Sequence, residues 1–154
     1  MKKSWLKRAA GILFTDGKSI LLLKKSKNGD NAGTWGLPGG KSNEGETEID
    51  NAIRETKEET GIPTIPGYRF HSMTTKNGGK KFTTFFYRVP DSFDVKLSKE
   101  HSDFEWVKFE DLTSKNLHPK LKLNISECLY TIKKKTSTFS EWLILKETIK
   151  YLSP

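Results

Sequence analysis

The sequence holds a single cysteine among its 154 residues, and it contains no long apolar run. With only Cys128 available, an intrachain disulfide is excluded, which fits a reducing compartment. No apolar stretch approaches the ~18 residues that a membrane span needs, so we expect no membrane partner. Residues 1–14 resemble the start of a signal peptide over a short stretch only. Asp16 and Gly17 follow where a signal peptide would have its cleavage region. These absences favour a cytoplasmic protein.

The composition is that of one globular unit with a basic surface. Hydrophobic residues make up 34% and aromatic residues 11%, which suffices for one modest core. We therefore expect a single domain over residues 1–154, with C-terminal helices from about residue 121. The formal net charge of +8 attracts phosphorylated small molecules and is equally compatible with RNA ends. This positive charge is also explained by solubility alone.

The most informative stretch runs over residues 36–62, where a glycine-rich turn leads into a predicted helix rich in acids. Because a helix turns about 100° per residue, Glu58 and Glu59 lie roughly −60° and +40° from Glu55. We expect these three carboxylates to share one face and to need a cation such as Mg²⁺ beside them. The opposite, core-facing side is expected to carry Ile49, Ala52, Ile53, Thr56 and Thr60.

This stretch resembles the Nudix box, G-x5-E-x7-R-E-U-x-E-E-x-G-U, in which U is a bulky apolar residue. The matching positions are Gly40, Glu46, Arg54, Glu55, Thr56, Glu58, Glu59, Gly61 and Ile62. Thr56 is the one departure, and its methyl group still allows packing. Seven fixed positions match by chance about once in 10⁸ trials at average residue usage. The resemblance extends over roughly residues 5–120 and implies a Nudix-type α/β/α sandwich with a mixed central sheet.

The residue patterns by themselves favour the same α/β class. Short apolar runs predict strands at residues 9–14, 20–24, 35–37, 68–75, 81–89 and 103–109. Helices are predicted from the cap Thr47 to the glycine stop Gly61, over 125–133, and over 140–152 with Ser140 as cap. Strand 81–89 is apolar on both faces and should lie centrally, covered on both sides. Residues 91–102 are expected to form a long polar loop, and residues 133–138 a polar break. The second C-terminal helix presents Trp142, Leu145, Ile149 and Leu152 on one face.

The resemblance implies an enzyme that hydrolyses a nucleoside diphosphate linked to another moiety, with Mg²⁺ (or Mn²⁺) as cofactor. It implies that Glu55, Glu58, Glu59 and the carbonyl of Gly40 bind the metal. Arg54 stands four residues before Glu58, so it can pair with that carboxylate and orient it. Glu46 precedes the helix and is interpreted as structural.

Glu100 is a further candidate because it stands six residues before Trp106. In MutT-like members a glutamate at this spacing approaches the metals and is a candidate base, so we assign that role to Glu100. Asp103 and Glu105 compete for the same role. His101 is expected at most to modify the properties of its neighbour Glu100.

Three residues are candidates for substrate binding. His118 lies where MutT-like proteins place a base-recognising loop, and Pro119 follows it. Trp35 can stack on a base, although an aromatic residue on a strand is usually part of the core. Arg8 is a candidate phosphate contact, which no spacing argument ranks above Lys24 or Arg88.

Three functions remain open on the sequence alone. The first is hydrolysis of a small nucleotide, and a (deoxy)nucleoside triphosphate is favoured because residues 35–41 are most similar to MutT-like members. The second is RNA 5′-end pyrophosphohydrolysis, which a contiguous basic groove leading to the acids would favour. The third is a non-catalytic nucleotide-binding module, against which the complete set of acids argues. The C-terminal helices either cover the core or serve as a homodimer face.

Overall fold

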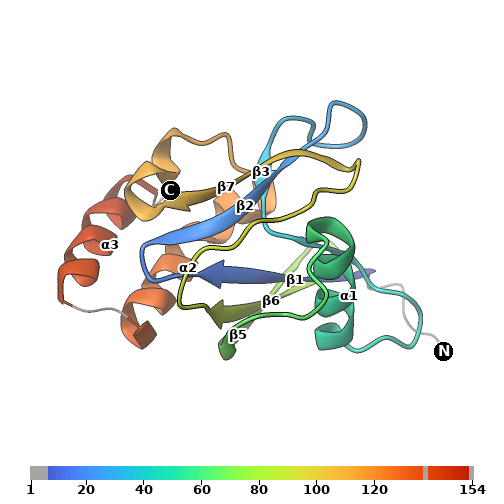
Figure 1. Cartoon of the computed structure of the whole chain (residues 1–154), viewed down its shortest axis with the longest axis horizontal. Coiled ribbons are helices and arrows are strands. Elements are labelled where there is room, and N and C mark those ends of the chain that lie inside the picture. Colours follow the sequence, from blue (N-terminus) through green and yellow to red (C-terminus); the bar gives the residue numbers. More distant parts are fainter. Residues whose placement is uncertain (1–6, 137–138, 153–154) are drawn as a thin grey trace.

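A computed structural model describes residues 7–136 and 139–152 (Figure 1). The chain orders its elements as β1 (Lys7–Thr15), β2 (Ser19–Lys25), β3 (Trp35–Gly36), β4 (Gly39–Lys41), α1 (Glu48–Thr60), β5 (Tyr68–Asn77), β6 (Lys80–Arg88), β7 (His101–Lys108), the 3-10 helix η1 (Phe109–Ser114), α2 (Pro119–Thr136) and α3 (Phe139–Leu152). The six predicted strands are present with shifted ends, and β4 adds a short strand that the sequence did not predict. No helix of the described residues is long and apolar enough to cross a membrane.

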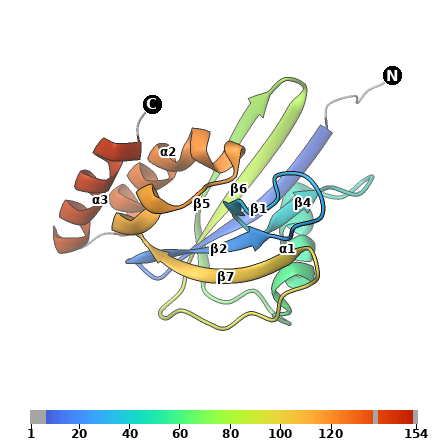
Figure 2. The same ribbon diagram turned by 90° about the horizontal axis from the view of Figure 1, so that it is seen from above.

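The described strands form one mixed sheet of seven strands, as expected. Its main path runs β3-β2-β1-β6-β5, while β4 pairs with β1 and β7 pairs with β2. Only β1 and β6 pair in parallel among the described strands, with Lys7 opposite Lys80 and Thr15 opposite Arg88. This long parallel pairing aligns the start of β1 with the tip of the β5–β6 hairpin (Figure 2).

Helices cover both faces of the sheet, which gives the α/β/α layering (Figures 1 and 2). Alternate side chains of a strand point to opposite faces, so Leu13 joins the cluster under α2 while Phe14 joins the cluster under α1. Phe86 and Phe85 of β6 are divided between the two clusters in the same way. The prediction that this strand is covered on both sides is confirmed.

Helix α1 has the predicted ends. The hydroxyl of Thr47 accepts a hydrogen bond from the backbone N–H of Asp50 at 3.2 Å, which caps the first turn. Gly61 ends the helix in the left-handed region at φ 71°, where a side chain would be strained.

The C-terminal helices differ from the predictions. Helix α2 begins at Pro119, because proline suits the first helical turn, and it continues to Thr136, past the predicted break at Lys133. Helix α3 begins at Phe139, so Ser140 is inside it and is not its cap. Ile149 and Leu152 pack against the core, while the side chains of Trp142 and Leu145 lie outside the described part of the chain.

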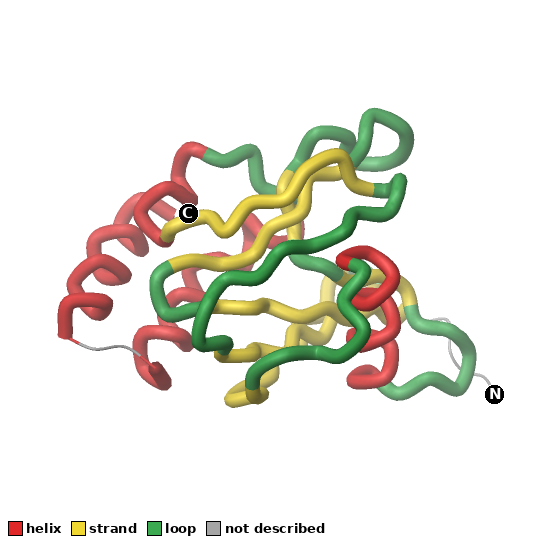
Figure 3. The backbone as a smooth tube through the Cα atoms, viewed as in Figure 1, coloured by secondary structure: helices red, strands yellow, loops and turns green. Residues whose placement is uncertain are grey.

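The loop from residue 89 to residue 100 crosses the sheet beside α1 (Figure 3). The backbone N–H of Lys96 donates to the carbonyl of Thr60 at 2.7 Å, which ties this loop to the end of the helix. The loop ends two residues earlier than predicted, because His101 already belongs to β7. Glu100 is therefore fixed between a tethered loop and the start of a strand.

Candidate functional site

The acids of α1 do not share one exposed stripe. The side chain of Glu58 is 58% exposed, whereas Glu59 is buried with only 4% of its surface exposed. Ala52 is buried in the core, as expected, but it stands two turns before Glu59 and therefore lies on the same side of the helix as that acid. Glu59 thus reaches into the protein, and Glu58 stays at the rim.

The glycine-rich turn packs directly against two of these carboxylates. The backbone N–H of Gly39 donates to Oε1 of Glu59 at 2.9 Å. A Cβ atom added at Gly40 would lie 2.5 Å from Oε1 of Glu55, so only glycine leaves room for that carboxylate. The turn and the helix therefore fix the positions of Glu55 and Glu59 together.

Arg54 holds the outer acids in place. Its Nε donates to Glu46 at 2.8 Å, and its Nη1 donates to Glu55 at 3.0 Å and to Glu58 at 3.3 Å. The predicted pair with Glu58 is present, but the contact with Glu46 is the shorter one. The hydrogen bond from Arg54 lowers the pKa of Glu46, and the pKa of Arg54 is raised in turn. Arg54 therefore orients carboxylates from two parts of the chain.

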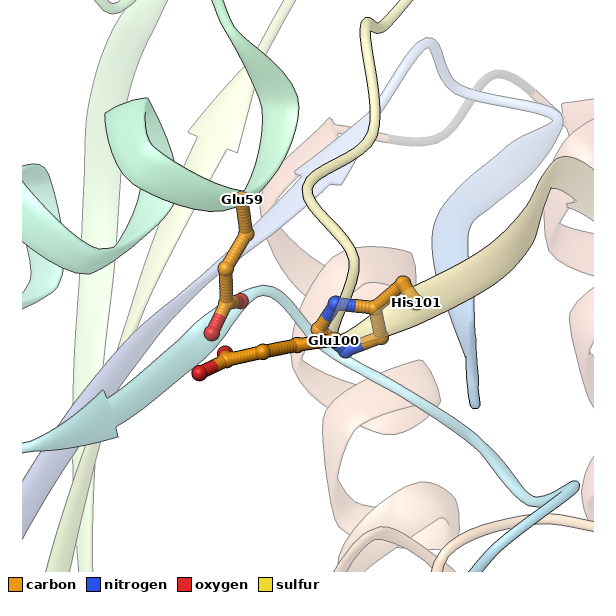
Figure 4. A group of neighbouring side chains, drawn as sticks. All are labelled: Glu59, Glu100 and His101. Carbon is orange, nitrogen blue, oxygen red and sulfur yellow. The ribbon is translucent and has the colours of Figure 1, made fainter. Parts of the chain in front are cut away.

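A second acid reaches Glu59 from the other side of the site. Glu59, Glu100 and His101 each offer one ligand atom, and these atoms lie within 4.8 Å of one another. Figure 4 shows the carboxylates of Glu59 and Glu100 pointing toward each other, with the ring of His101 beside them. Residues separated by some forty positions in the chain thus converge on one point.

The electrostatics of this cluster favour a bound cation. Burial is the main cause that raises the pKa of Glu59 to about 8; the hydrogen bond from Gly39 opposes this, and the nearby carboxylates of Glu55 and Glu100 add to it. Burial, with Lys25 nearby, lowers the pKa of His101 to about 4, so its ring is neutral at pH 7. Among the described residues no group hydrogen-bonds to its buried Nδ1. Two carboxylates and a free imidazole nitrogen fit a divalent metal ion.

The competing acids on β7 have other partners. Glu105 forms an ion pair with Lys115 at 2.5 Å, and the carboxylate of Asp103 accepts a hydrogen bond from the N–H of Phe104 at 2.8 Å. Of the three downstream acids considered, Glu100 alone joins the cluster.

A cavity of about 360 Å³ adjoins the acids. Gly39, Gly40 and His101 form its wall toward the cluster, and His118 lies on its lining. Nδ1 of His118 accepts a hydrogen bond from the N–H of Lys120 at 3.1 Å, and its Nε2 lies 3.2 Å from the side-chain amide of Asn31. Burial lowers the pKa of His118, which favours the neutral ring. His118 is thus placed where a bound molecule can meet it.

The other two predicted substrate contacts lie elsewhere. Trp35 is 8% exposed and belongs to the core, with Nζ of Lys115 4.4 Å from its ring centroid. Arg8 is exposed on β1. Neither belongs to the lining of the cavity, and their roles stay predictions.

Sequence reasoning missed most of the polar lining of the cavity, namely Lys25, Asn31, Lys41, Lys80, Lys120 and Asn124. These residues come from β2, the loop after it, β4, β6 and α2. No local pattern marks them, because only the packing of these segments brings them together.

Comparison with known proteins is consistent with this geometry. A family model described as NUDIX domain matches residues 5–128. The chain is 31% identical over 110 residues to the CTP pyrophosphohydrolase of Escherichia coli (strain K12), covering 71% of this chain and 81% of that protein. It is also 31% identical over 153 residues to the m7GpppN-mRNA hydrolase of Saccharomyces cerevisiae, covering 97% of this chain but 15% of that protein. The crystal structure of a Nudix hydrolase from M. smegmatis, RenU, matches with a TM-score of 0.74 and 21% identity, over 84% of this chain and 87% of that one, which shows a common fold.

Proposed function

Because the chain belongs to the NUDIX domain family, whose members hydrolyse phosphoanhydride bonds, we propose that it acts on a (deoxy)nucleoside triphosphate or a related small nucleotide. The observation that carries this proposal is the cluster of Glu59, Glu100 and His101 beside a cavity lined by lysines. The acids suit the cation that accompanies a polyphosphate, and the lysines suit its negative charge.

The residues that would hold Mg²⁺ or Mn²⁺ are Glu55 and Glu59, with Glu58 at the rim and the carbonyl of Gly40 beside them. A bound divalent ion neutralises phosphate charge and lowers the pKa of water. Arg54 keeps Glu55 and Glu58 oriented through the hydrogen bonds described above.

The chemical step follows from this arrangement. A water oxygen forms a bond to one phosphorus, the bridging P–O bond breaks, and the bridging electrons leave with the departing phosphate. We assign the acceptance of the water proton to Glu100, and its position at the end of a tethered loop, on the side of the cluster opposite α1, supports this assignment. The lysines of the cavity balance the charge of the polyphosphate during the step.

A substrate panel tests this function. The protein is incubated with Mg²⁺ or Mn²⁺ and with nucleoside triphosphates, ADP-ribose, dinucleoside polyphosphates and triphosphorylated RNA, beside Glu59→Gln and the exposed-site control Glu110→Gln. We expect Glu59→Gln to lose at least tenfold in turnover, about 1.4 kcal/mol of transition-state stabilisation, while the control keeps its rate. Equal rates for all three proteins would refute the assignment of the metal site.

The runner-up is hydrolysis at RNA 5′ ends. Two observations favour it: the similarity to a yeast mRNA hydrolase, and four lysines on one cavity next to the acids. Faster turnover of triphosphorylated RNA than of any free nucleotide would make it the main activity. Binding of nucleotides without turnover of any of them would instead indicate a non-catalytic module.

A further inference from the structure

The main chain at Glu100 is held by a residue from a distant part of the sequence. Ser26, the first residue after β2, donates its backbone N–H to the carbonyl of Glu100 at 3.0 Å. Its hydroxyl donates to the carbonyl of Lys99 at 2.7 Å. These two carbonyls belong to the peptide groups on either side of the Cα atom of Glu100. Ser26 therefore fixes the backbone from which this carboxylate extends.

A β-bulge in the ladder of β2 and β7 lies directly beside this contact. Lys24 pairs with Asp103 and Lys25 pairs with His101, so Ser102 is an extra residue on β7. Without it, the residues before it on β7 would shift by one position relative to β2. Bulges occur beside active sites, where they change the direction in which a side chain points. The two hydrogen bonds described above hold the chain in the shifted register.

The carboxylate of Glu100 lies where its own charge opposes it. One of its oxygens is within 4.8 Å of a carboxylate oxygen of Glu59, and like charges at this separation repel each other. Among the described residues, no group donates a hydrogen bond to the carboxylate of Glu100. Figure 4 shows this side chain extending from the start of β7 toward Glu59. The main chain must therefore keep the two acids together while no cation is bound.

The other long-range tethers on the loop side act farther away. The backbone N–H of Lys96 donates to the carbonyl of Thr60 at 2.7 Å, and the indole N–H of Trp106 donates to the carbonyl of Phe93 at 2.9 Å. Lys96 stands four residues before Glu100. Because an extended residue spans about 3.3 to 3.6 Å, these tethers alone would let Glu100 move by several ångströms.

We propose that Ser26 is a positioning residue for Glu100: its two hydrogen bonds keep the carboxylate at the acid cluster, where it accepts the proton of the attacking water. This role rests on the proposed function, because that function assigns the proton to Glu100. Ser26 does not belong to the lining of the cavity, so its substitution leaves the lining itself unchanged.

The experiment compares three single variants of the full chain. Ser26→Ala removes the hydrogen bond to Lys99, whereas Ser26→Thr keeps a hydroxyl group and is the conservative rescue. Ser114→Ala is the matched control, because the hydroxyl of Ser114 donates to the carbonyl of Asp111 at 2.8 Å in η1. Turnover is measured with Mn²⁺ and the fastest substrate of the panel, and isothermal titration gives the dissociation constant for Mn²⁺. Circular dichroism verifies that each variant is folded.

We expect Ser26→Ala to lower kcat about tenfold, because a misplacement of about 1 Å can cost up to about 10²-fold in rate. KM and the dissociation constant for Mn²⁺ should stay within about twofold of the wild type, as should every parameter of Ser26→Thr and Ser114→Ala. A wild-type kcat for Ser26→Ala would overturn the proposal. So would a loss of Mn²⁺ affinity as large as the loss of turnover, because the metal site would then be the part disturbed.

A double-variant cycle shows whether Ser26 acts through Glu100. In the background of Glu100→Gln, the further change Ser26→Ala should alter kcat by less than about twofold, because no proton acceptor is left to position. Multiplied losses in the double variant would contradict the proposal.

A second measurement needs no substrate. The backbone N–H of His101 donates to the carbonyl of Ser98 at 3.2 Å, in the turn that carries Glu100. In EDTA, this amide should exchange its hydrogen at least about fivefold faster in Ser26→Ala than in the wild type or Ser114→Ala, as NMR measures. Unchanged exchange would refute the positioning role whatever the turnover. Full turnover by Glu100→Gln would instead refute the proton-accepting role in the proposed function, and the exchange rates then decide alone whether Ser26 holds this turn.

Discussion

The carboxyl group of Glu59 couples the stability of the metal-free protein to pH. Its pKa of about 8 lies above the ordinary value of 4.5, chiefly because it is buried. The folded chain therefore holds a proton that the unfolded chain releases between these two pH values. The free energy of unfolding must fall as pH rises through this window, and the stabilisation is complete only below the unfolded pKa.

The size of this effect follows from the two pKa values. Between pH 5 and pH 7 they give a loss of about 2 to 3 kcal/mol in the free energy of unfolding from this one group. With only 4% of its surface exposed, Glu59 is little screened by solvent. Glutamine keeps the shape of the protonated carboxyl group but cannot ionise, so Glu59→Gln should lack this part of the pH dependence.

The assay is urea unfolding of the wild type and Glu59→Gln in EDTA at pH 5, 6 and 7. Relative to Glu59→Gln, the free energy of unfolding of the wild type should fall by about 2 to 3 kcal/mol from pH 5 to pH 7. Adding a divalent metal at pH 7 should release about 0.9 proton per chain from the wild type and none from this position in the variant, as calorimetry in two buffers measures. Parallel pH profiles, together with equal proton release, would refute a buried protonated carboxyl group at Glu59.

Three further substitutions test how the site is held. Gly40→Ala should displace the carboxylate of Glu55, because its Cβ would lie 2.5 Å from Oε1, and we expect at least tenfold slower turnover with an unchanged thermal midpoint. Arg54→Lys keeps the charge but loses the planar fork that joins Glu46 to Glu55, so the dissociation constant for Mn²⁺ in an isothermal titration should rise about tenfold. Thr47→Ala removes the cap of α1 and should lower the free energy of unfolding in urea by about 1 kcal/mol with little change in turnover; a loss of activity without a loss of stability would contradict this role.

The parts of the fold that were predicted well are those with local causes. Helix α1 is bounded by a side-chain cap at Thr47 and a left-handed glycine at Gly61, and both signals are read from the residues themselves. Helix α2 was predicted six residues too short at its start, because Leu121 and its neighbours acquire their helical pattern only when the helix packs on the sheet. The short strand β4 has three residues, two of them glycines, and exists because β1 offers it hydrogen-bond partners.

The candidate site likewise combines residues that local spacing identifies with positions that only the packing of the fold decides. Spacing along the helix singled out Glu55, Glu58 and Glu59, but it could not tell that Glu59 is buried and Glu58 exposed, since burial depends on what lies against the helix. Glu100 was assigned through the resemblance to MutT-like members, on its position six residues before Trp106, and it lies next to Glu59.

By itself, the sequence determined the residue types that suit a divalent cation, the helix that carries most of them, and the glycines that flank them. Helical periodicity and capping are short-range effects, so a single stretch of chain contains all the information they need. Tertiary structure alone decided that a loop end meets Glu59 and that lysines from β4, β6 and α2 line one cavity. These contacts depend on strand register and on the docking of distant segments, and both are set by the packing of the whole core.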